Sequence, residues 1–264
     1  MISVLLPVTT IWWREIIRFY RQRSRLFSAI AQPLVFWILI GSGLSASFQP
    51  SGIAEKPGYI EYFYPGIVVL VLLFTAIFAT ISVVNERREG FLQGVLVAPV
   101  ARWGIVLGQA LGGTTLALLQ GLLLLFLAPF IGIRFGLASL LLTLGVMTLL
   151  AFGLTNLGLL IAWRMDSTQG FHAIMNLILI PIWLLSGALF PSTGAPGWLV
   201  WVMKLNPLTY GVAAFRRSLY FDTETTIGNM PTWTLSLLII SLFCFLTYLG
   251  ATLTASAETN KKHA

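Results

Sequence analysis

The chain has 264 residues, of which 57% are hydrophobic and only 9% are charged. Soluble domains carry about 25% charged residues, so this composition excludes a soluble protein and indicates an integral membrane protein. No polar stretch reaches the ~50 residues of a minimal soluble domain. The net charge of +7 follows from the basic residues that membrane proteins keep on one side of the bilayer, and it does not indicate nucleic-acid binding.

Apolar runs of roughly 20 residues recur along the whole length, which predicts an all-α polytopic membrane protein with one domain, residues 1–264. Six spans are expected, at about 26–47, 62–84, 104–131, 138–162, 171–190 and 232–254. If the N-terminus is inside, few of the 16 basic residues fall outside: Lys56, Arg134, Lys204, Arg216 and Arg217. The positive-inside rule therefore predicts that both termini are cytoplasmic. We expect the protein in the cell (inner or plasma) membrane.

Residues 11–25, ahead of the first span, have helical periodicity. The arginines recur every three or four residues, as Arg14, Arg18, Arg21 and Arg25. They fall in one stripe at ~100° per residue, and the opposite side carries aromatic residues, among them Trp12 and Trp13. This pattern predicts an amphipathic helix in the headgroup layer, with its arginines toward anionic lipid or a partner. An ordinary positive-inside flank is the alternative.

Two further segments carry packing signals. The third span begins with Gly104, Gly108 and Gly112, a spacing that lets another helix approach closely. The segment 191–231 is partly apolar and too long for a tight turn. It predicts short re-entrant helices at the extracytoplasmic side, interrupted at Asn206-Pro207 because the residue before a proline disfavours helix.

The sequence carries little catalytic chemistry. Its histidines and aspartates are isolated, with no metal-ligand spacing, and no lysine stands in a phosphate-binding P-loop. The span centres lack the ionisable residues on which ion-coupled transporters usually depend. We therefore expect no catalytic residue, metal or cofactor in this chain. Asn156 and Asn176 are polar residues at membrane depth that could line a path, although hydrogen bonds between helices explain them as well.

A polar island at 85–102, NERREGFLQGVLVAPVAR, separates spans two and three. Together with a second stretch it resembles the permease subunits of ABC type-2 exporters. In the island, Arg88-Glu89-x-x-Leu92 and the following Leu-Val-Ala-Pro-Val resemble the family's cytoplasmic segment. Phe91, Gln93 and Ala98 depart from the family pattern, so partner recognition there is expected to differ.

The second stretch is the more specific one. It contains Ser-Gly-x-x-Phe-Pro, Pro-x-Trp-Leu, Asn-Pro-Leu-Thr-Tyr and a trailing arginine, in the family's order. Its residues are Ser186, Gly187, Pro191, Asn206, Pro207, Tyr210 and Arg216. With six expected spans, the resemblance covers nearly the whole chain.

The resemblance implies two permease subunits, expected to be a homodimer, and two ATPase subunits that bind ATP and Mg²⁺. It also implies that segment 85–102 forms a coupling helix docking on the ATPase. In this interpretation Asn85 caps the helix, acidic residues occupy its first turn, and arginines pair with the partner. The expected coupling residues are Glu86, Arg87, Arg88, Glu89, Gly90 and Leu92. A solvated loop is the alternative.

The leading hypothesis is therefore the transmembrane subunit of an ATP-driven exporter. The apolar, uncharged interior favours an amphipathic or lipid-linked substrate over a small ion, although it equally reflects the bilayer environment. The resemblance implies a drug-like or a lipid- or saccharide-linked substrate. The alternatives are a secondary transporter or channel without an ATPase partner, and a membrane scaffold without transport activity.

Overall fold

A computed structural model of the chain describes residues 5–21, 31, 35, 37–39, 41–43, 59–90, 100–193, 195–222 and 230–260. In these residues the regular structure is helical throughout, as expected for the all-α class. The elements are α1 (Leu5–Arg21), α3 (Tyr59–Ala79), α4 (Ile81–Arg88), α6 (Arg102–Leu125), η1 (Ala128–Ile131), α7 (Leu137–Ala162), α8 (Thr168–Leu184), α9 (Gly197–Leu205), α10 (Pro207–Leu219) and α11 (Trp233–Asn260).

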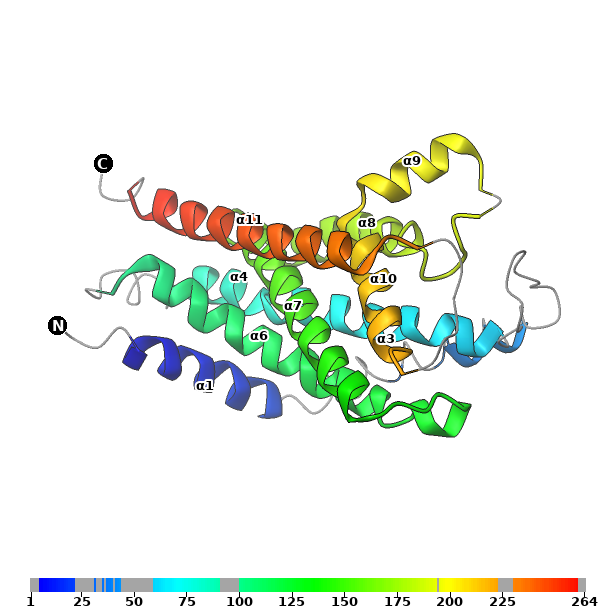
Figure 1. Cartoon of the computed structure of the whole chain (residues 1–264). Helices are drawn as coiled ribbons and strands as arrows, with labels where there is room; N and C mark the ends of the chain where they lie inside the picture. Colours follow the sequence, from blue (N-terminus) through cyan, green and yellow to red (C-terminus); the bar gives the residue numbers. More distant parts are fainter. Residues whose placement is uncertain are drawn as a thin grey trace.

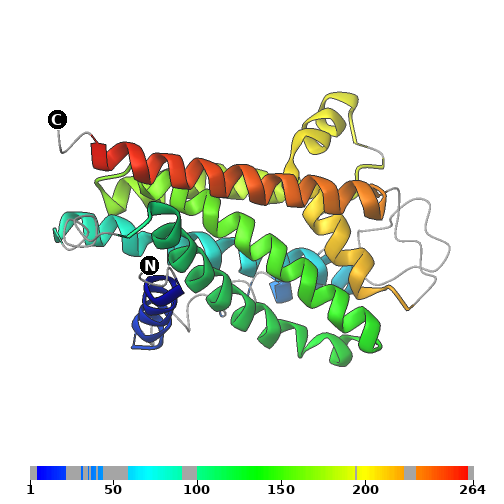
Figure 2. The same ribbon diagram turned by 60° about the vertical axis from the view of Figure 1, so that its left-hand side comes forward.

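Helix α3 is the central helix of the bundle. In its segment, Tyr59–Arg88, 83% of the most apolar window is buried, compared with 28% in Trp233–Ala257 at α11. A helix that is apolar on all sides is expected to be surrounded by other helices, and α3 packs against α6, α7, α8 and α10. Helix α11 covers α7 on the outside of the bundle, and α1 lies along α6 (Figures 1 and 2).

Four of the expected spans correspond to helices long and apolar enough to cross a membrane. They are Tyr59–Arg88, Arg102–Ile131, Leu137–Ala162 and Trp233–Ala257. The first expected span, 26–47, lies largely outside the described residues. The total of six therefore stays a prediction.

The fifth expected span, 171–190, is shorter than predicted. Helix α8 has 17 residues and ends at Leu184. Its start is capped by Ser167, whose hydroxyl accepts a hydrogen bond from the Gly170 amide. A turn containing Gly187, with φ of 77°, follows its end. A left-handed glycine is a common way to stop a helix, so the chain changes direction before residue 190.

The segment 191–231 contains two short helices, α9 and α10, as expected. Asn206 lies between them: its side-chain oxygen accepts a hydrogen bond from the Leu208 amide at 3.0 Å, and Pro207 begins α10. Helix α9 projects from the bundle (Figure 1). Whether these helices re-enter a membrane stays a prediction.

Several connections meet at one end of the bundle, which we call the charged end. The end of α4, the start of α8 and the end of α11 lie there (Figure 1). Arg87 in the last turn of α4 contacts Trp163 just beyond α7, and Tyr248 of α11 donates to the carbonyl of Trp103 at the start of α6. This arrangement agrees with the alternating direction expected for consecutive spans. The end at which α3 begins is called the opposite end.

Candidate functional site

The polar island begins inside a helix, which corrects the predicted start of the coupling segment. Asn85 lies within α4, whose N-terminal capping position is occupied by Thr80, so Asn85 is not a helix cap. Glu86 and Glu89 consequently lie near the C-terminal end of α4 and not in a first turn. Helix α4 follows α3 after a single residue, Thr80, whose hydroxyl donates to the Ile77 carbonyl, so Tyr59–Arg88 forms one long apolar segment.

The end of α4 had a recognisable signal in the sequence. Arg87 and Arg88 occupy the last turn, and Gly90 follows with a φ of 76°. Basic residues in a last turn and a left-handed glycine just beyond it mark a helix C-terminus. Leu92 and the rest of 91–99 lie outside the described residues, so a coupling helix there stays a prediction.

Glu86 is buried inside the chain, which corrects its assignment to a partner-facing position. Its side chain is 1% exposed, and its Oε1 lies 2.7 Å from a guanidinium nitrogen of Arg18 and 2.8 Å from one of Arg14. Arg14 also pairs with the buried Glu15 at 2.9 Å. We call Arg14, Glu15, Arg18 and Glu86 the charge cluster.

The charge cluster also corrects the predicted orientation of α1. Two arginines of the expected stripe, Arg14 and Arg18, face Glu86 of the same chain and not anionic lipid or a partner. Arg21 is exposed, whereas Arg25 lies outside the described residues. Buried carboxylates require counter-charges, so α1 supplies the cations that make Glu86 tolerable in the bundle. The helix begins at Leu5, earlier than predicted.

The glycine row of α6 is the surface on which α1 packs. Gly104, Gly108 and Gly112 are all buried. A Cβ on Gly108 would lie 2.9 Å from the Val8 carbonyl oxygen, and one on Gly112 would lie 2.7 Å from Cβ of Glu15. Trp12 of α1 donates from Nε1 to the Thr115 hydroxyl of α6 at 3.0 Å, while Trp13 is exposed. Only glycine lets the two helices come this close.

Arg87 connects α4 to the loop between α7 and α8. It donates to the Trp163 carbonyl at 2.6 Å and pairs through Nε with Asp166 at 3.0 Å. Trp163 is fully buried, whereas Asp166 is exposed. Arg87 therefore fixes the charged ends of three helices relative to one another.

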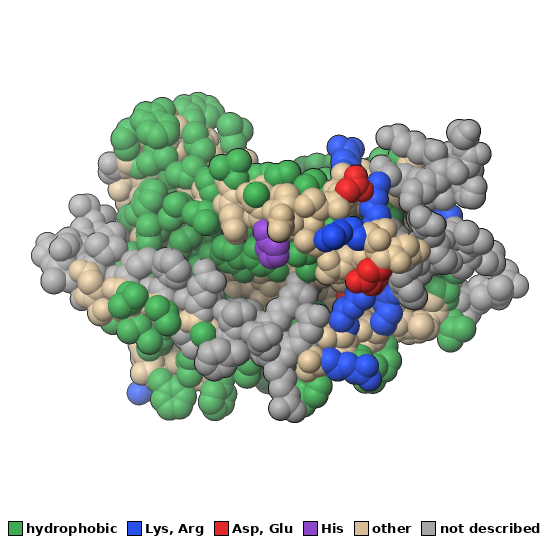
Figure 3. Space-filling view, turned by 180° about the vertical axis from the view of Figure 1, so that it is seen from behind, with side chains coloured by type: hydrophobic (Ala, Val, Ile, Leu, Met, Phe, Trp, Pro, Cys, Tyr) green, Lys and Arg blue, Asp and Glu red, His purple; other side chains and the backbone are tan. Residues whose placement is uncertain are grey.

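The charges that remain accessible at this end belong to few residues. Arg88, Glu89, Arg164 and Asp166 are exposed, and we call them the docking surface. Figure 3 shows basic and acidic side chains gathered at one end of a surface that is otherwise largely apolar. Arg87 and the charge cluster join the backbone beneath this surface to the end of α7 and to α1.

The family-like residues of the second stretch meet at the opposite end, around the start of α3. Ser186 is buried and donates to the Trp183 carbonyl, and Trp183 donates to the Gly66 carbonyl at 2.8 Å. Tyr62 donates to the Gly187 carbonyl. The segment 185–190 is thereby held on α3, and Pro191 follows it.

The remaining members of that stretch bind α10 to its neighbours. Asn206 donates from Nδ2 to the Ile182 carbonyl at 2.6 Å, so it joins α8 to the α9–α10 junction. Tyr210 donates to the Lys204 carbonyl across the same junction. Arg216 donates to the Tyr62 carbonyl. Sequence reasoning selected these residues by resemblance, and the structure shows what each one contacts.

The two residues proposed for a path are not brought together. Asn156 on α7 is fully buried and donates to the Phe152 carbonyl within its own helix. Asn176 lies on the exposed face of α8. One residue is buried and the other exposed, so they do not share a surface within one chain, and a role in a path stays a prediction.

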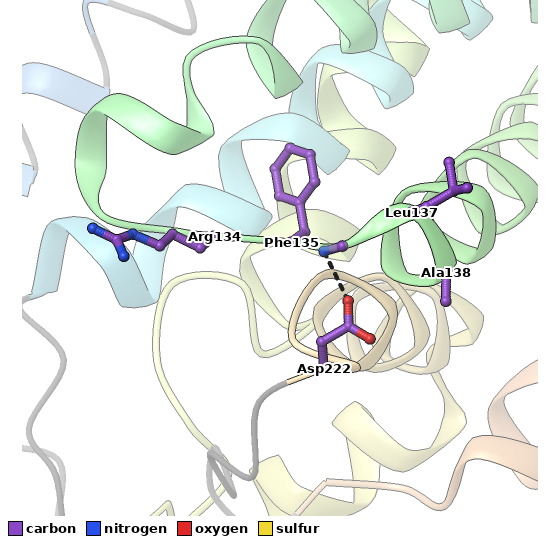
Figure 4. A pocket seen from close by; sticks show the side chains of 6 residues that line it. Arg134, Phe135, Leu137, Ala138 and Asp222 are labelled. Atoms are coloured by element: carbon purple, nitrogen blue, oxygen red, sulfur yellow. Dashed lines mark hydrogen bonds between the residues drawn. The ribbon is translucent and has the colours of Figure 1, made fainter.

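A shallow pocket lies at the start of α7. It has a volume of about 560 Å³ and is lined by Arg134, Phe135, Gly136, Leu137, Ala138 and Asp222 (Figure 4). Asp222 accepts a hydrogen bond from the Gly136 amide at 2.7 Å, which caps α7. The carboxylate is thus already used by the fold. In the described part of the chain, no group of three or more His, Cys, Asp or Glu residues could hold a metal ion.

The described bundle has four helices long and apolar enough to cross a membrane, as in a polytopic membrane protein, and comparison with known proteins specifies the family. Residues 7–220 match the family model described as ABC-2 type transporter, so the chain belongs to that family.

Several proteins that resemble the chain are named as transport permeases. The chain is 30% identical over 206 residues to a putative transport permease ycf38 of Cyanophora paradoxa, covering 77% of this chain and 70% of that protein. It is 26% identical over 264 residues to the Porphyra purpurea protein of the same name, covering 94% and 87%. It is also 27% identical over 159 residues to the probable multidrug ABC transporter permease YbhR of Escherichia coli strain K12, covering 58% and 42%.

Proposed function

We propose that this chain is the transmembrane permease subunit of an ATP-driven exporter and that a separate ATPase subunit docks at its charged end. The observation that carries the proposal is the docking surface, whose exposed Arg88 and Glu89 stand on a base fixed by buried ion pairs. Exposed charges of both signs suit recognition by a complementary surface. ATP and Mg²⁺ are bound by the partner, and this chain has no catalytic role.

The orientation follows from the same proposal. The charged end and both termini lie in the cytoplasm, where the ATPase and its nucleotide are found, and the opposite end faces outward. Closure of two ATPase subunits moves the docking surface, and the fixed ends of α4 and α7 carry that movement into the spans. The protein lies in the cell membrane.

A second copy of this chain completes the transport path. Asn176 is exposed on α8 at membrane depth and makes no hydrogen bond within the described residues. A polar side chain is costly in lipid and usually faces another helix or a water-filled cavity. The α8 face therefore packs toward its symmetry mate, and the substrate passes between the two copies. An apolar surround with few amides suits an amphipathic, drug-like or lipid- or saccharide-linked substrate, and one relative is named as a multidrug permease.

The test uses the full chain in lipid nanodiscs with the ABC ATPase encoded nearest to it. The ATPase is expected to bind, and its hydrolysis rate is expected to change on binding. Glu89→Lys and Arg88→Glu should each weaken binding by about ten-fold or more, because each reverses an exposed charge at the interface. Lys204→Glu, at the opposite end, serves as the control and should leave binding unchanged.

Two results would count against the proposal. If no ABC ATPase binds the wild-type chain, the permease assignment fails. If binding is normal but insensitive to both charge reversals, the ATPase docks elsewhere. Uptake driven by a proton or sodium gradient in ATP-free vesicles would instead support a secondary transporter.

A further inference from the structure

Arg216 is an arginine buried among helices. It lies in the last turn of α10. Its side chain is among the largest fully buried side chains of the described residues, and only 2% of the residue is exposed. Its Nη2 donates to the Tyr62 carbonyl at 3.0 Å, and its guanidinium carbon lies 4.2 Å from the centre of the Tyr62 ring. Both contacts join α10 to α3.

The charge of Arg216 is only partly compensated. No carboxylate lies within 4.0 Å of it in the described residues, and its Nε makes no hydrogen bond there. A guanidinium has five N–H donors, and a buried charge with unused donors is costly. Within the bundle the two contacts with Tyr62 take the place of water, so the guanidinium becomes hydrated only when α10 leaves α3.

A second contact accompanies the first. Tyr220, just beyond α10, is hydrogen bonded to Glu61 near the start of α3. Burial, followed by the negative charge of Glu61, raises the pKa of Tyr220.

The other polar contacts of α10 go to different helices. Ser139 of α7 donates to the carbonyls of Ser218 and Leu219. Arg217 is exposed and donates to the carbonyl of Pro231, just ahead of α11. Helix α10 also packs more extensively on α7 and α11 than on α3. Its attachment to α3 therefore depends on a small number of side chains, and Arg216 is the central one.

We propose that Arg216 and Tyr62 form a latch that holds α10 on α3 and keeps the opposite end of the bundle closed. The latch releases when that end opens, and the guanidinium then becomes hydrated. Its role in export depends on the proposed function, because opening at this end is the step that would release substrate outward. Arg216 acts here as a positioning residue and needs no contact with substrate.

The test measures opening directly, with the full chain alone in lipid nanodiscs. Ala213 on α10 lies one helical turn before Arg216, on the same side of the helix, and is buried. The free thiol of Cys244 is removed by Cys244→Ser. In this background the Ala213→Cys thiol should react slowly with a charged, membrane-impermeant maleimide. Arg216→Gln removes the charge and the ring contact, and it should accelerate labelling about ten-fold or more.

Matched variants separate the latch from a general loss of structure. Arg217→Gln removes a neighbouring arginine that also donates to backbone carbonyls, and labelling should stay at the parent rate. Tyr62→Phe keeps the ring and should label near the parent rate. Tyr62→Leu removes the ring but leaves the backbone carbonyl to which Arg216 donates, so it should label faster than the parent and more slowly than Arg216→Gln. The double variant Arg216→Gln/Tyr62→Leu should label no faster than Arg216→Gln, because the ring contact is already lost there.

The proposal is overturned if Arg216→Gln labels at the parent rate, or if Arg217→Gln accelerates labelling equally. It is also overturned if Arg216→Gln equally exposes an Ala117→Cys thiol in the buried part of α6, which would indicate unfolding. If Arg216→Gln does not fold, Arg216→Lys must give an intermediate rate, and a parent-like rate contradicts the latch. The assay contains no ATPase, so its failure leaves the docking proposal standing.

Discussion

The charge cluster makes a specific prediction about Glu86 and Glu89, two acids of the same short segment. Glu86→Gln removes the carboxylate that faces Arg14 and Arg18, and it leaves the two arginines of α1 without their shared counter-ion. Glu89→Gln removes an exposed charge that has no ion pair in the described part of the chain. The first variant should destabilise the protein, and the second should not.

The magnitude follows from burial. Removing one partner of a fully buried ion pair costs about 3–5 kcal/mol. Here the side chains of Arg14 and Arg18 are 30% and 34% exposed, so water can rehydrate them in the variant. We therefore expect a cost of about 2 kcal/mol for Glu86→Gln, and an apparent Tm lower by roughly 4–8 °C for a chain of this size.

The assay is thermal unfolding of the purified full chain in one detergent, followed by intrinsic fluorescence. A charge exchange, Arg18→Glu with Glu86→Arg, keeps the cluster neutral and should recover at least half of the loss. A Glu86→Gln protein that melts with the wild type would refute the reasoning. Equal losses for Glu86→Gln and Glu89→Gln would do so too, because the difference in burial would then have no consequence.

Two further pairs of variants use the same melting assay, one to test close packing and one to test a buried hydrogen bond. Gly112→Ala places a Cβ 2.7 Å from Cβ of Glu15 and should lower the apparent Tm by several degrees, whereas Gly145→Ala meets open space and should raise it slightly or leave it unchanged. Trp183→Phe loses the buried hydrogen bond to Gly66 and should cost about 1–3 kcal/mol, while Trp198→Phe changes an exposed side chain and should stay within about 0.5 kcal/mol.

The sequence predicts helices and their class well, because the length of an apolar run is a local property. Four expected spans therefore correspond to long apolar helices, and Asn206-Pro207 marks the junction of α9 and α10. Helix ends were less reliable. The end of α8 was predicted too late because apolar residues continue past Leu184, although the chain turns at Gly187.

Periodicity could not predict which group the arginine stripe of α1 contacts. The spacing of Arg14 and Arg18 correctly places them on one side of a helix, but their partner Glu86 is far away in sequence and was itself expected to face another protein. Only the packing of α1 on the glycines of α6 brings these groups together. Long-range pairing of this kind depends on tertiary structure, which local sequence patterns do not predict.

The correction to Glu86 strengthens the case that the charged end works mechanically. If Glu86 were exposed, a docking partner could bind the end of α4 without engaging the rest of the chain. Instead Arg88 and Glu89 continue the same helix turn that Glu86 joins to α1 and Arg87 joins to the end of α7. A buried ion pair breaks only at considerable cost, so displacement of the docking surface moves these elements together. At the opposite end the attachment of α10 to α3 is sparse. Under the proposed function, force enters at the end where these contacts join α1, α4 and α7, and α10 then parts from α3, where its attachment is sparse.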